Sequence, residues 1–259
     1  MLHFLKAVLI IGGRIIASYF AWMRKFAKNK DKYSFKERYS KVRILLQKLC
    51  RALTVTSHVQ GVEKIPDDTC LIVSNHLSAF DPVLMIAAFD KPCTFVAKKE
   101  LQNKPFAGKV ITGIDGQFLD RKDLKQSLRV MMNVEEDLKK KEKNWIIFPE
   151  GTRNKDPNHL VADFHHGTFR PAVKAGVPIV PVAVYGTFRA LKKKPLFKNY
   201  HVFMKVLDPI YPNDYKDMST QDLANLARER IQQAVSFELR GLDHKAMIND
   251  EKYRFNEIL

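Results

Sequence analysis

Short apolar runs alternate with segments of helical periodicity along most of this chain, and that alternation constrains the fold more than any other feature. Runs with strand character occupy residues 53–56, 70–73, 93–97, 144–148, 179–185 and 201–207. Helical periodicity is found at 35–53, 82–89, 124–141, 167–175 and 221–239. Strands that alternate with helices form α/β folds. We therefore predict an α/β protein with a mixed, largely parallel sheet flanked by helices.

The positive charge of the chain is concentrated near the N-terminus. Lys and Arg number 44 against 28 acidic residues, a net charge of +16, and residues 24–51 alone hold eleven basic and two acidic residues. A charge of this size predicts a polyanionic partner, either nucleic acid or an anionic membrane face. Because the basic stretch follows an apolar segment, the membrane is favoured, and we expect no nucleic-acid partner.

The apolar N-terminal segment has the pattern of an amphipathic helix. At about 100° per residue its charged side chains fall within an arc of about 100°; they are His3, Lys6, Arg14, Lys25 and Lys28. Arg14 also interrupts the apolar run well before the about 20 residues that a spanning helix needs. We expect this helix to lie in the membrane interface, and packing on the body of the protein is the alternative.

These patterns divide the chain into three parts. Residues 1–52 are expected to form a basic, amphipathic two-helix unit that associates with the membrane, and residues 53–215 the α/β domain. Residues 216–259 are expected to hold a C-terminal helix and tail that pack on this domain. The expected location is the cell membrane, as a peripheral or monotopic protein on the cytoplasmic face.

The cysteines and histidines give no support for a metal or a cofactor. Cys50, Cys70 and Cys93 have no paired spacing and stand in apolar contexts, so we expect them to be reduced and buried. There is no Cys-x-x-Cys and no histidine pair with the spacing of a zinc site. We expect neither metal nor cofactor.

The run from Ser74 to Pro82 places His76 and Asp81 five positions apart, across a predicted strand-to-helix junction. In α/β sheets, chemistry is commonly placed beyond the carboxyl ends of strands. A histidine held by a carboxylate can take a proton from a hydroxyl group, which makes the pair a candidate general base. Asp81 before Pro82 is also an ordinary helix start, with Asp as the N-cap. The spacing alone leaves both interpretations open.

Three later segments follow this run in a fixed order: 116–121 (GQFLDR), 148–153 (FPEGTR) and 177–182 (VPIVPV). Together with the His76–Asp81 run they resemble the four sequence blocks of the glycerolipid acyltransferase superfamily. The resemblance is greatest to its 1-acyl-glycerol-3-phosphate (lysophosphatidate) acyltransferases and covers roughly residues 55–190. Their order and spacing are far more specific than any single block.

The resemblance implies transfer of an acyl chain from acyl-CoA or acyl-carrier protein to the sn-2 hydroxyl of 1-acyl-glycerol-3-phosphate, giving phosphatidate at an anionic membrane surface. The alternatives are another acceptor, such as glycerol 3-phosphate or another lysolipid, and a non-catalytic basic adaptor that binds lipid. The resemblance implies that His76 deprotonates the acceptor hydroxyl and that Asp81 orients the His76 ring. Ser78 lacks a Gly-x-Ser-x-Gly elbow and is not expected to be a nucleophile.

The other blocks supply residues for the acceptor. Arg121 and Arg153 are expected to hold its phosphate, because a guanidinium fork matches phosphate oxygens. Glu150 is expected to bond the acceptor glycerol or to anchor an arginine, and an ion pair with Arg153 is the alternative. The resemblance also assigns to the acceptor site Lys98 (or its neighbour Lys99), Gly116, Gly151 and Thr152. The segment 177–182 is expected to be an edge strand in the core.

Overall fold

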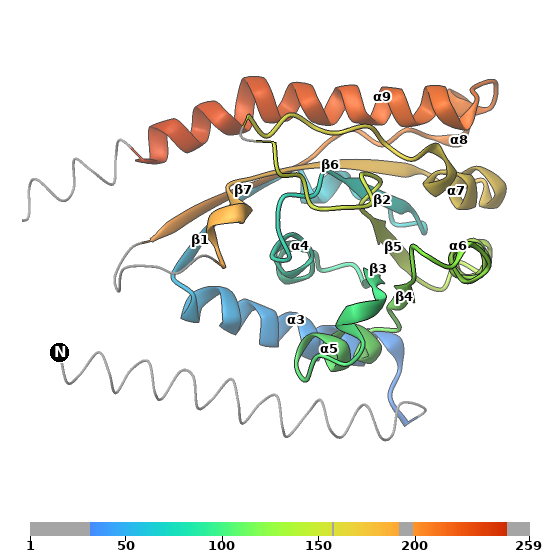
Figure 1. Cartoon of the computed structure of the whole chain (residues 1–259), viewed down its shortest axis with the longest axis horizontal. Helices are drawn as coiled ribbons and strands as arrows, with labels where there is room; N and C mark the ends of the chain where they lie inside the picture. Colours follow the sequence, from blue (N-terminus) through green and yellow to red (C-terminus); the bar gives the residue numbers. More distant parts are fainter. Residues whose placement is uncertain (1–31, 157, 192–198, 248–259) are drawn as a thin grey trace, which may run out of the picture.

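The computed structural model describes residues 32–156, 158–191 and 199–247. Within them, the strands form one seven-stranded sheet in the order β1-β7-β6-β2-β5-β3-β4 (Figure 1). The strands are β1 (Val55–Gln60), β2 (Leu71–Ser74), β3 (Cys93–Lys98), β4 (Gln117–Leu119), β5 (Asn144–Ile147), β6 (Ile179–Tyr185) and β7 (Tyr200–Val206).

Five neighbouring strands of the sheet, β6, β2, β5, β3 and β4, run parallel to one another. Strand β7 is antiparallel to β6, and β1 is parallel to β7. The predicted fold class, a mixed and largely parallel α/β sheet, is therefore confirmed. The carboxyl ends of the five parallel strands meet at one edge, which we call the carboxyl edge, and their amino ends define the amino edge.

Helices cover both faces of the sheet. One face carries α3 (Phe35–Ala52), α4 (Asp81–Ala88) and α5 (Ala107–Gly113), and the other carries α6 (Leu124–Lys139), α7 (Arg170–Ala175) and α9 (Thr220–Gln233). The short helix α8 (Pro212–Tyr215) precedes α9, which continues as a π-helix over Ala234–Leu239. Figure 1 shows α9 on one side of the sheet and α3, α4 and α5 on the other. Both faces are covered because strands such as β2 are apolar at successive positions: Leu71 and Val73 point into one core and Ile72 into the other.

Helix α3 belongs to the α/β body. Its apolar stripe, with Val42 and Leu46, is buried in the same core as α4. The buried Arg38 donates to both carboxylate oxygens of Asp115 at 2.8 and 2.7 Å and to the carbonyl of Gly113 at 2.7 Å. The boundary expected after residue 52 therefore does not separate α3 from the domain, since an apolar stripe has the same periodicity whether a membrane or a protein core covers it.

The other helix of the expected N-terminal unit falls in residues 1–31, outside the described residues. Among the helices that are described, no stretch is both apolar enough and long enough to cross a bilayer.

Strand β6 is a central strand, so the expectation of an edge strand at 177–182 is wrong. It lies between β2 and β7, and every residue in it is buried. Its Pro181 is tolerated because it stands where the ladder with β7 ends. There Leu207 N–H donates to the Pro181 carbonyl at 2.9 Å, and only the return bond is missing.

The three cysteines are free and buried, as expected. Burial raises the pKa of Cys50 to about 11 and the pKa of Cys70 and Cys93 to about 12. Because the thiolate is the reactive form, these thiols have little nucleophilic character at neutral pH.

Candidate active site

The chain leaves the sheet after β2 at a point that the Asn75 side chain fixes. Its Nδ2 donates to the Val184 carbonyl at 3.0 Å, and its Oδ1 accepts from Val184 N–H at 2.9 Å. Main-chain pairing of β2 with β6 ends at Ser74 and Val182, so the buried amide extends the ladder one step farther. The next residue, His76, therefore starts from a rigid position on the carboxyl edge.

The His76 ring contacts the Asp81 carboxylate. Nδ1 lies 2.8 Å from Asp81 Oδ2, and the ring stacks on Phe148 with its centroid 4.3 Å away. The His76 side chain is 17% exposed, whereas that of Asp81 is 0% exposed. A carboxylate beside Nδ1 favours the tautomer with the proton on Nδ1. This leaves the Nε2 lone pair, which no described residue engages, to accept a proton from a substrate.

Asp81 is the first residue of α4 and does not cap it. The N-cap is Phe80, and Asp81 Oδ2 instead accepts from the backbone N–H groups of Leu77 and Ser78, both at 2.8 Å. The alternative of an N-cap aspartate is therefore wrong, and one carboxylate oxygen holds both the ring and the loop that carries it. Ser78 is buried and its Oγ accepts from Phe80 N–H at 3.1 Å, a structural contact.

Glu150 holds the backbone of His76. Its Oε1 accepts from His76 N–H at 2.7 Å, and its Oε2 accepts from Ala162 N–H at 3.3 Å. From the same loop, Asn154 N–H donates to the His76 carbonyl at 2.7 Å. The expected contacts of Glu150 with an arginine are not formed, and no ion pair joins it to Arg153 among the residues with described positions. Burial raises the pKa of Glu150, and the His76 and Ala162 N–H donors oppose that shift.

The raised pKa of Glu150 gives a pH-dependent prediction. A carboxyl group whose pKa is higher in the folded than in the unfolded protein binds more protons when folded. The Glu150 carboxyl group thus contributes to the stability of the folded protein below its ordinary pKa of 4.5. This contribution is lost as pH rises through the raised pKa of the folded state. In Glu150→Gln the group cannot titrate. We expect the Tm of the wild type to fall relative to that of Glu150→Gln between about pH 4 and pH 7.

Thermal unfolding of the two proteins in one buffer series measures this difference, because all other titrating groups are shared. A wild-type Tm that rises relative to the variant over this interval contradicts the prediction.

The loop after β5 places Arg153 beside His76. Gly151 has a φ of 67°, and a Cβ there would lie 3.0 Å from the His165 ring, so glycine is needed at this turn. Thr152 and Arg153 follow it and are exposed. Arg153 directly precedes Asn154, whose N–H donates to the His76 carbonyl. The Arg153 guanidinium makes no hydrogen bond or ion pair to a described residue.

Arg121 and Lys98 also lie at the carboxyl edge, since they follow β4 and end β3. Three strand spacings, about 14 Å, separate β4 from β2. Arg121 is exposed and has no hydrogen bond or ion pair within the described chain. Lys98 pairs with Glu100 at 3.0 Å, and its neighbour Lys99 pairs with Asp120 at 3.0 Å. The carboxyl edge thus brings together His76, Asp81, Glu150, Arg153, Arg121 and Lys98.

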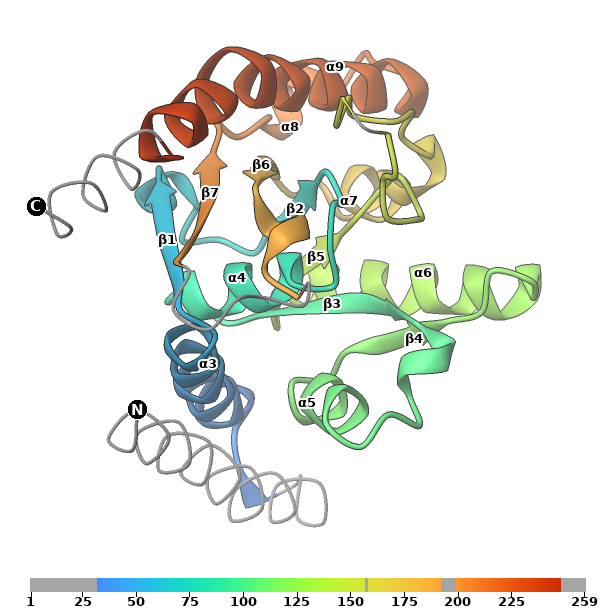
Figure 2. The same ribbon diagram turned by 60° about the vertical axis from the view of Figure 1, so that its left-hand side comes forward.

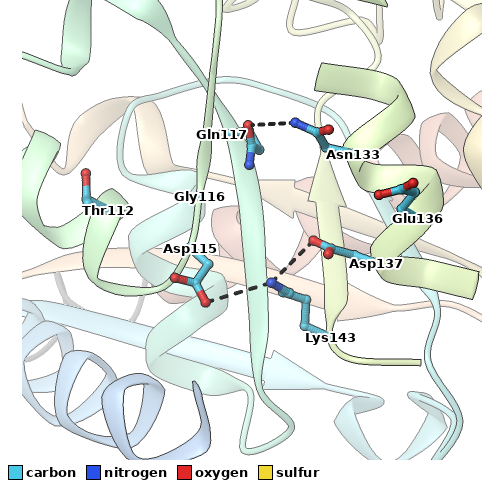
Figure 3. Close-up of a pocket in the computed structure, with 8 residues that line it drawn as sticks. All are labelled: Thr112, Asp115, Gly116, Gln117, Asn133, Glu136, Asp137 and Lys143. Atoms are coloured by element: carbon cyan, nitrogen blue, oxygen red, sulfur yellow. Dashed lines mark hydrogen bonds and ion pairs between the residues drawn. The ribbon is translucent and has the colours of Figure 1, made fainter. Parts of the chain in front are cut away.

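Gly116 does not share this edge, contrary to expectation. It precedes β4 and so lies at the amino edge, where a Cβ would come within 2.5 Å of Ile111 Cγ2. There it lines a pocket of about 330 Å³ whose Lys143 points between Asp137, at 3.3 Å, and Asp115, at 3.8 Å (Figure 3). This pocket is at the opposite end of the strands from His76, and its lysine is already paired with carboxylates.

Sequence reasoning missed two residues of the site, Asn75 and Asn154. Each acts through a contact with a distant or irregular segment, and neither stands in a periodic pattern. For a metal, the described residues contain no group of three or more suitable ligands.

Comparison with known proteins supports one family. The sequence model of the Acyltransferase family matches residues 56–185. A Mycoplasma pneumoniae protein named as a probable 1-acyl-sn-glycerol-3-phosphate acyltransferase is 30% identical over 210 residues, covering 73% of this chain and 77% of that protein. The 1-acyl-sn-glycerol-3-phosphate acyltransferase of Saccharomyces cerevisiae is 28% identical over 193 residues, covering 74% of this chain and 62% of that protein.

Among solved structures, the crystal structure of the 1-acyl-sn-glycerophosphate (LPA) acyltransferase PlsC from Thermotoga maritima superposes with a TM-score of 0.65 at 26% identity. The match covers 90% of this chain and 91% of that one. The resemblance seen in the four sequence blocks is thereby confirmed.

Proposed function

The chain belongs to the acyltransferase family, and from this premise we propose that it moves an acyl chain from an acyl thioester to the sn-2 hydroxyl of 1-acyl-glycerol-3-phosphate, giving phosphatidate. The observation that carries the proposal is the 2.8 Å contact between Nδ1 of the part-exposed His76 ring and the fully buried carboxylate of Asp81. The names of the relatives support the acceptor.

In this mechanism His76 Nε2 takes the proton of the acceptor hydroxyl while the oxygen attacks the thioester carbonyl. A tetrahedral intermediate forms, and its collapse breaks the carbon–sulfur bond and releases the thiolate. The imidazolium then returns the proton to the thiolate, so that the products are the ester and a free thiol. Asp81 stabilises the imidazolium and keeps the ring orientation, and no acyl-enzyme is needed.

Exposed cations around the same edge serve the acceptor phosphate in this proposal. Arg153 and Arg121 have guanidinium groups that no described residue pairs, and planar guanidinium binds phosphate with two parallel hydrogen bonds. Lys98, held by a single exposed ion pair, adds charge. Glu150 holds the loop itself, because it bonds the main chain of His76. Gly151 and the exposed Thr152 follow it on the acceptor side in this proposal.

The donor in this proposal is acyl-CoA or acyl-carrier protein, and the enzyme works peripherally on the cytoplasmic face of the cell membrane. The net charge of +16, with its excess in residues 24–51, supports attraction to anionic lipid.

A panel of acceptors tests the function. With 1-acyl-glycerol-3-phosphate we expect a kcat/KM at least about 100-fold higher than with 1-acyl-glycerol, which lacks the phosphate. Arg153→Ala and Arg121→Ala should each raise KM for the phosphorylated acceptor about tenfold or more and leave the slow reaction with 1-acyl-glycerol nearly unchanged.

Arg240→Ala, which removes an exposed arginine from the C-terminal helix, is the matched control. Equal rates with 1-acyl-glycerol-3-phosphate and 1-acyl-glycerol contradict the proposed recognition of the phosphate. A preference for glycerol 3-phosphate identifies that compound as the acceptor instead. Vesicle binding without acyl transfer from either donor points to the adaptor instead.

A further inference from the structure

The outer face of α6 carries an apolar row that no described element covers. Leu124, Leu128 and Met132 follow one another at intervals of four residues and are 74%, 52% and 64% exposed. Contiguous exposed apolar side chains of this size mark interaction surfaces. Lys125 and Arg129 form a second row beside them. We call these five residues the α6 ridge.

The basic residues of the α6 ridge are unpaired, in contrast to those farther along the same helix. Lys125 and Arg129 are exposed and make no ion pair or hydrogen bond with the described part of the chain. In the last turns, Lys139 pairs with Glu135 at 2.5 Å and Lys140 with Glu136 at 3.9 Å. Positive charge on α6 is therefore left uncompensated only in its N-terminal half, which points to an acidic partner.

The α6 ridge begins beside the carboxyl edge of the sheet. The Gln126 side chain accepts from Asp120 N–H at 2.8 Å and donates to the Phe118 carbonyl at 2.6 Å, which ties the first turn of α6 to the end of β4. From there the helix runs back toward the amino edge and packs against α7 and β5. Figures 1 and 2 show α6 at the outside of the α/β body.

The geometry of the ridge fits a helix of another protein better than a bilayer. At about 100° per residue, the buried Val130, Val134 and Leu138 define the inward direction, and Lys125 points directly away from it. A helix lying in a bilayer needs apolar residues at its outermost positions, where this one has a cation. Two parallel rows at intervals of four residues, one apolar and one basic, are the ridges that pack into the grooves of a facing helix.

We propose that the α6 ridge docks an acidic helical carrier protein that bears the acyl thioester and delivers it to His76. This inference rests on the proposed function and names its donor. The first turn of α6 is tied to the end of β4, about 14 Å from β2 across the carboxyl edge, so a carrier protein docked on the ridge has to present its acyl group on an arm of at least that length.

Charge reversal on the ridge tests the inference. Kinetics of the wild type and of the double variant Lys125→Glu/Arg129→Glu are measured with acyl-carrier protein and with acyl-CoA of the same chain length. For the carrier protein we expect KM to rise about tenfold or more and to lose its dependence on salt. With acyl-CoA, kcat/KM should stay within about twofold, since neither side chain touches a described residue of the site.

The matched control is Lys139→Glu/Lys140→Glu, which makes the same charge change in the paired half of the same helix and should leave both donors unaffected. The ridge variants should keep the wild-type Tm because the replaced side chains are exposed.

Equal losses with both donors, or no loss with the carrier protein, overturn the inference. Reduced binding of the double variant to anionic phosphatidylglycerol vesicles, with unchanged use of carrier protein, assigns the ridge to lipid. Turnover with acyl-CoA but none with carrier protein overturns the inference and leaves the proposed function standing. If neither donor is used, the proposed function fails; direct titration of acyl-carrier protein onto wild type and variant then decides the docking surface by itself.

Discussion

His76→Ala is expected to lower kcat about a thousandfold or more and to leave the protein folded. The ring supplies the only proposed proton acceptor for the substrate hydroxyl, and general base catalysis contributes about 10²- to 10⁴-fold. The fold should survive because the part-exposed ring contacts chiefly Asp81 and Phe148, and the Asp81 carboxylate keeps its two backbone donors. Single-turnover rates at saturating acceptor, together with Tm, separate the two effects.

His166→Ala is the matched control, since His166 is exposed and within the described part of the chain its ring makes a single hydrogen bond, to Thr220. Its rate should equal that of the wild type. A His76→Ala enzyme with the wild-type single-turnover rate contradicts the mechanism, because no other group in the proposal accepts the proton.

The fold was largely predictable because its elements have strong local patterns. Strand β6 begins and ends where the apolar run 179–185 does, and α3 follows its apolar stripe within one residue. Sequence reasoning missed β4 with three residues, α5 with seven and α8 with four, which are too short to show a period. The prolines of 177–182 suggested an edge strand, but one proline at the end of a ladder costs a single hydrogen bond.

The contact between His76 and Asp81 was predictable because the two residues are close in sequence and stand at a strand end. The role of Glu150 was not, because its bond to His76 N–H joins residues 74 positions apart and depends on β2 and β5 being neighbours. Gly116 was misplaced for a related reason: the block 116–121 contains β4, so its first and last residues lie at opposite edges of the sheet.

Four residues hold the loop around His76, three through their side chains and Asn154 through its backbone N–H. Asn75 fixes the exit from β2, Glu150 and Asn154 hold the two polar groups of the His76 backbone, and Asp81 holds the ring. Because catalysis depends on positioning to within fractions of an ångström, we expect these contacts to affect the rate of the proposed reaction as well as the stability of the protein. In the proposed mechanism Asp81 both holds the loop and stabilises the imidazolium, and two substitutions at its position distinguish these roles.

Asp81→Asn is expected to lower kcat about 100- to 1000-fold with little change in Tm. Asp81 Oδ2 accepts all three hydrogen bonds, from His76, Leu77 and Ser78, and Oδ1 is buried with no partner among the described residues. An asparagine can therefore keep its oxygen at the Oδ2 position and place its amide nitrogen where Oδ1 lies. The geometry survives, and what is lost is the negative charge that stabilises the imidazolium.

Asp81→Ala removes the acceptor as well and leaves buried N–H groups unpaired, at a cost of about 1–3 kcal/mol for each. Its Tm should fall by about 10 °C, given about 2–4 °C per kcal/mol for a domain of this size. Steady-state kinetics and thermal unfolding of both variants test the division. If Asp81→Asn turns over at the wild-type rate, the carboxylate only holds the loop, and the charge has no part in catalysis. If Asp81→Asn is instead as unstable as Asp81→Ala, the amide does not occupy the carboxylate's place, and its loss of activity reports on folding rather than on charge.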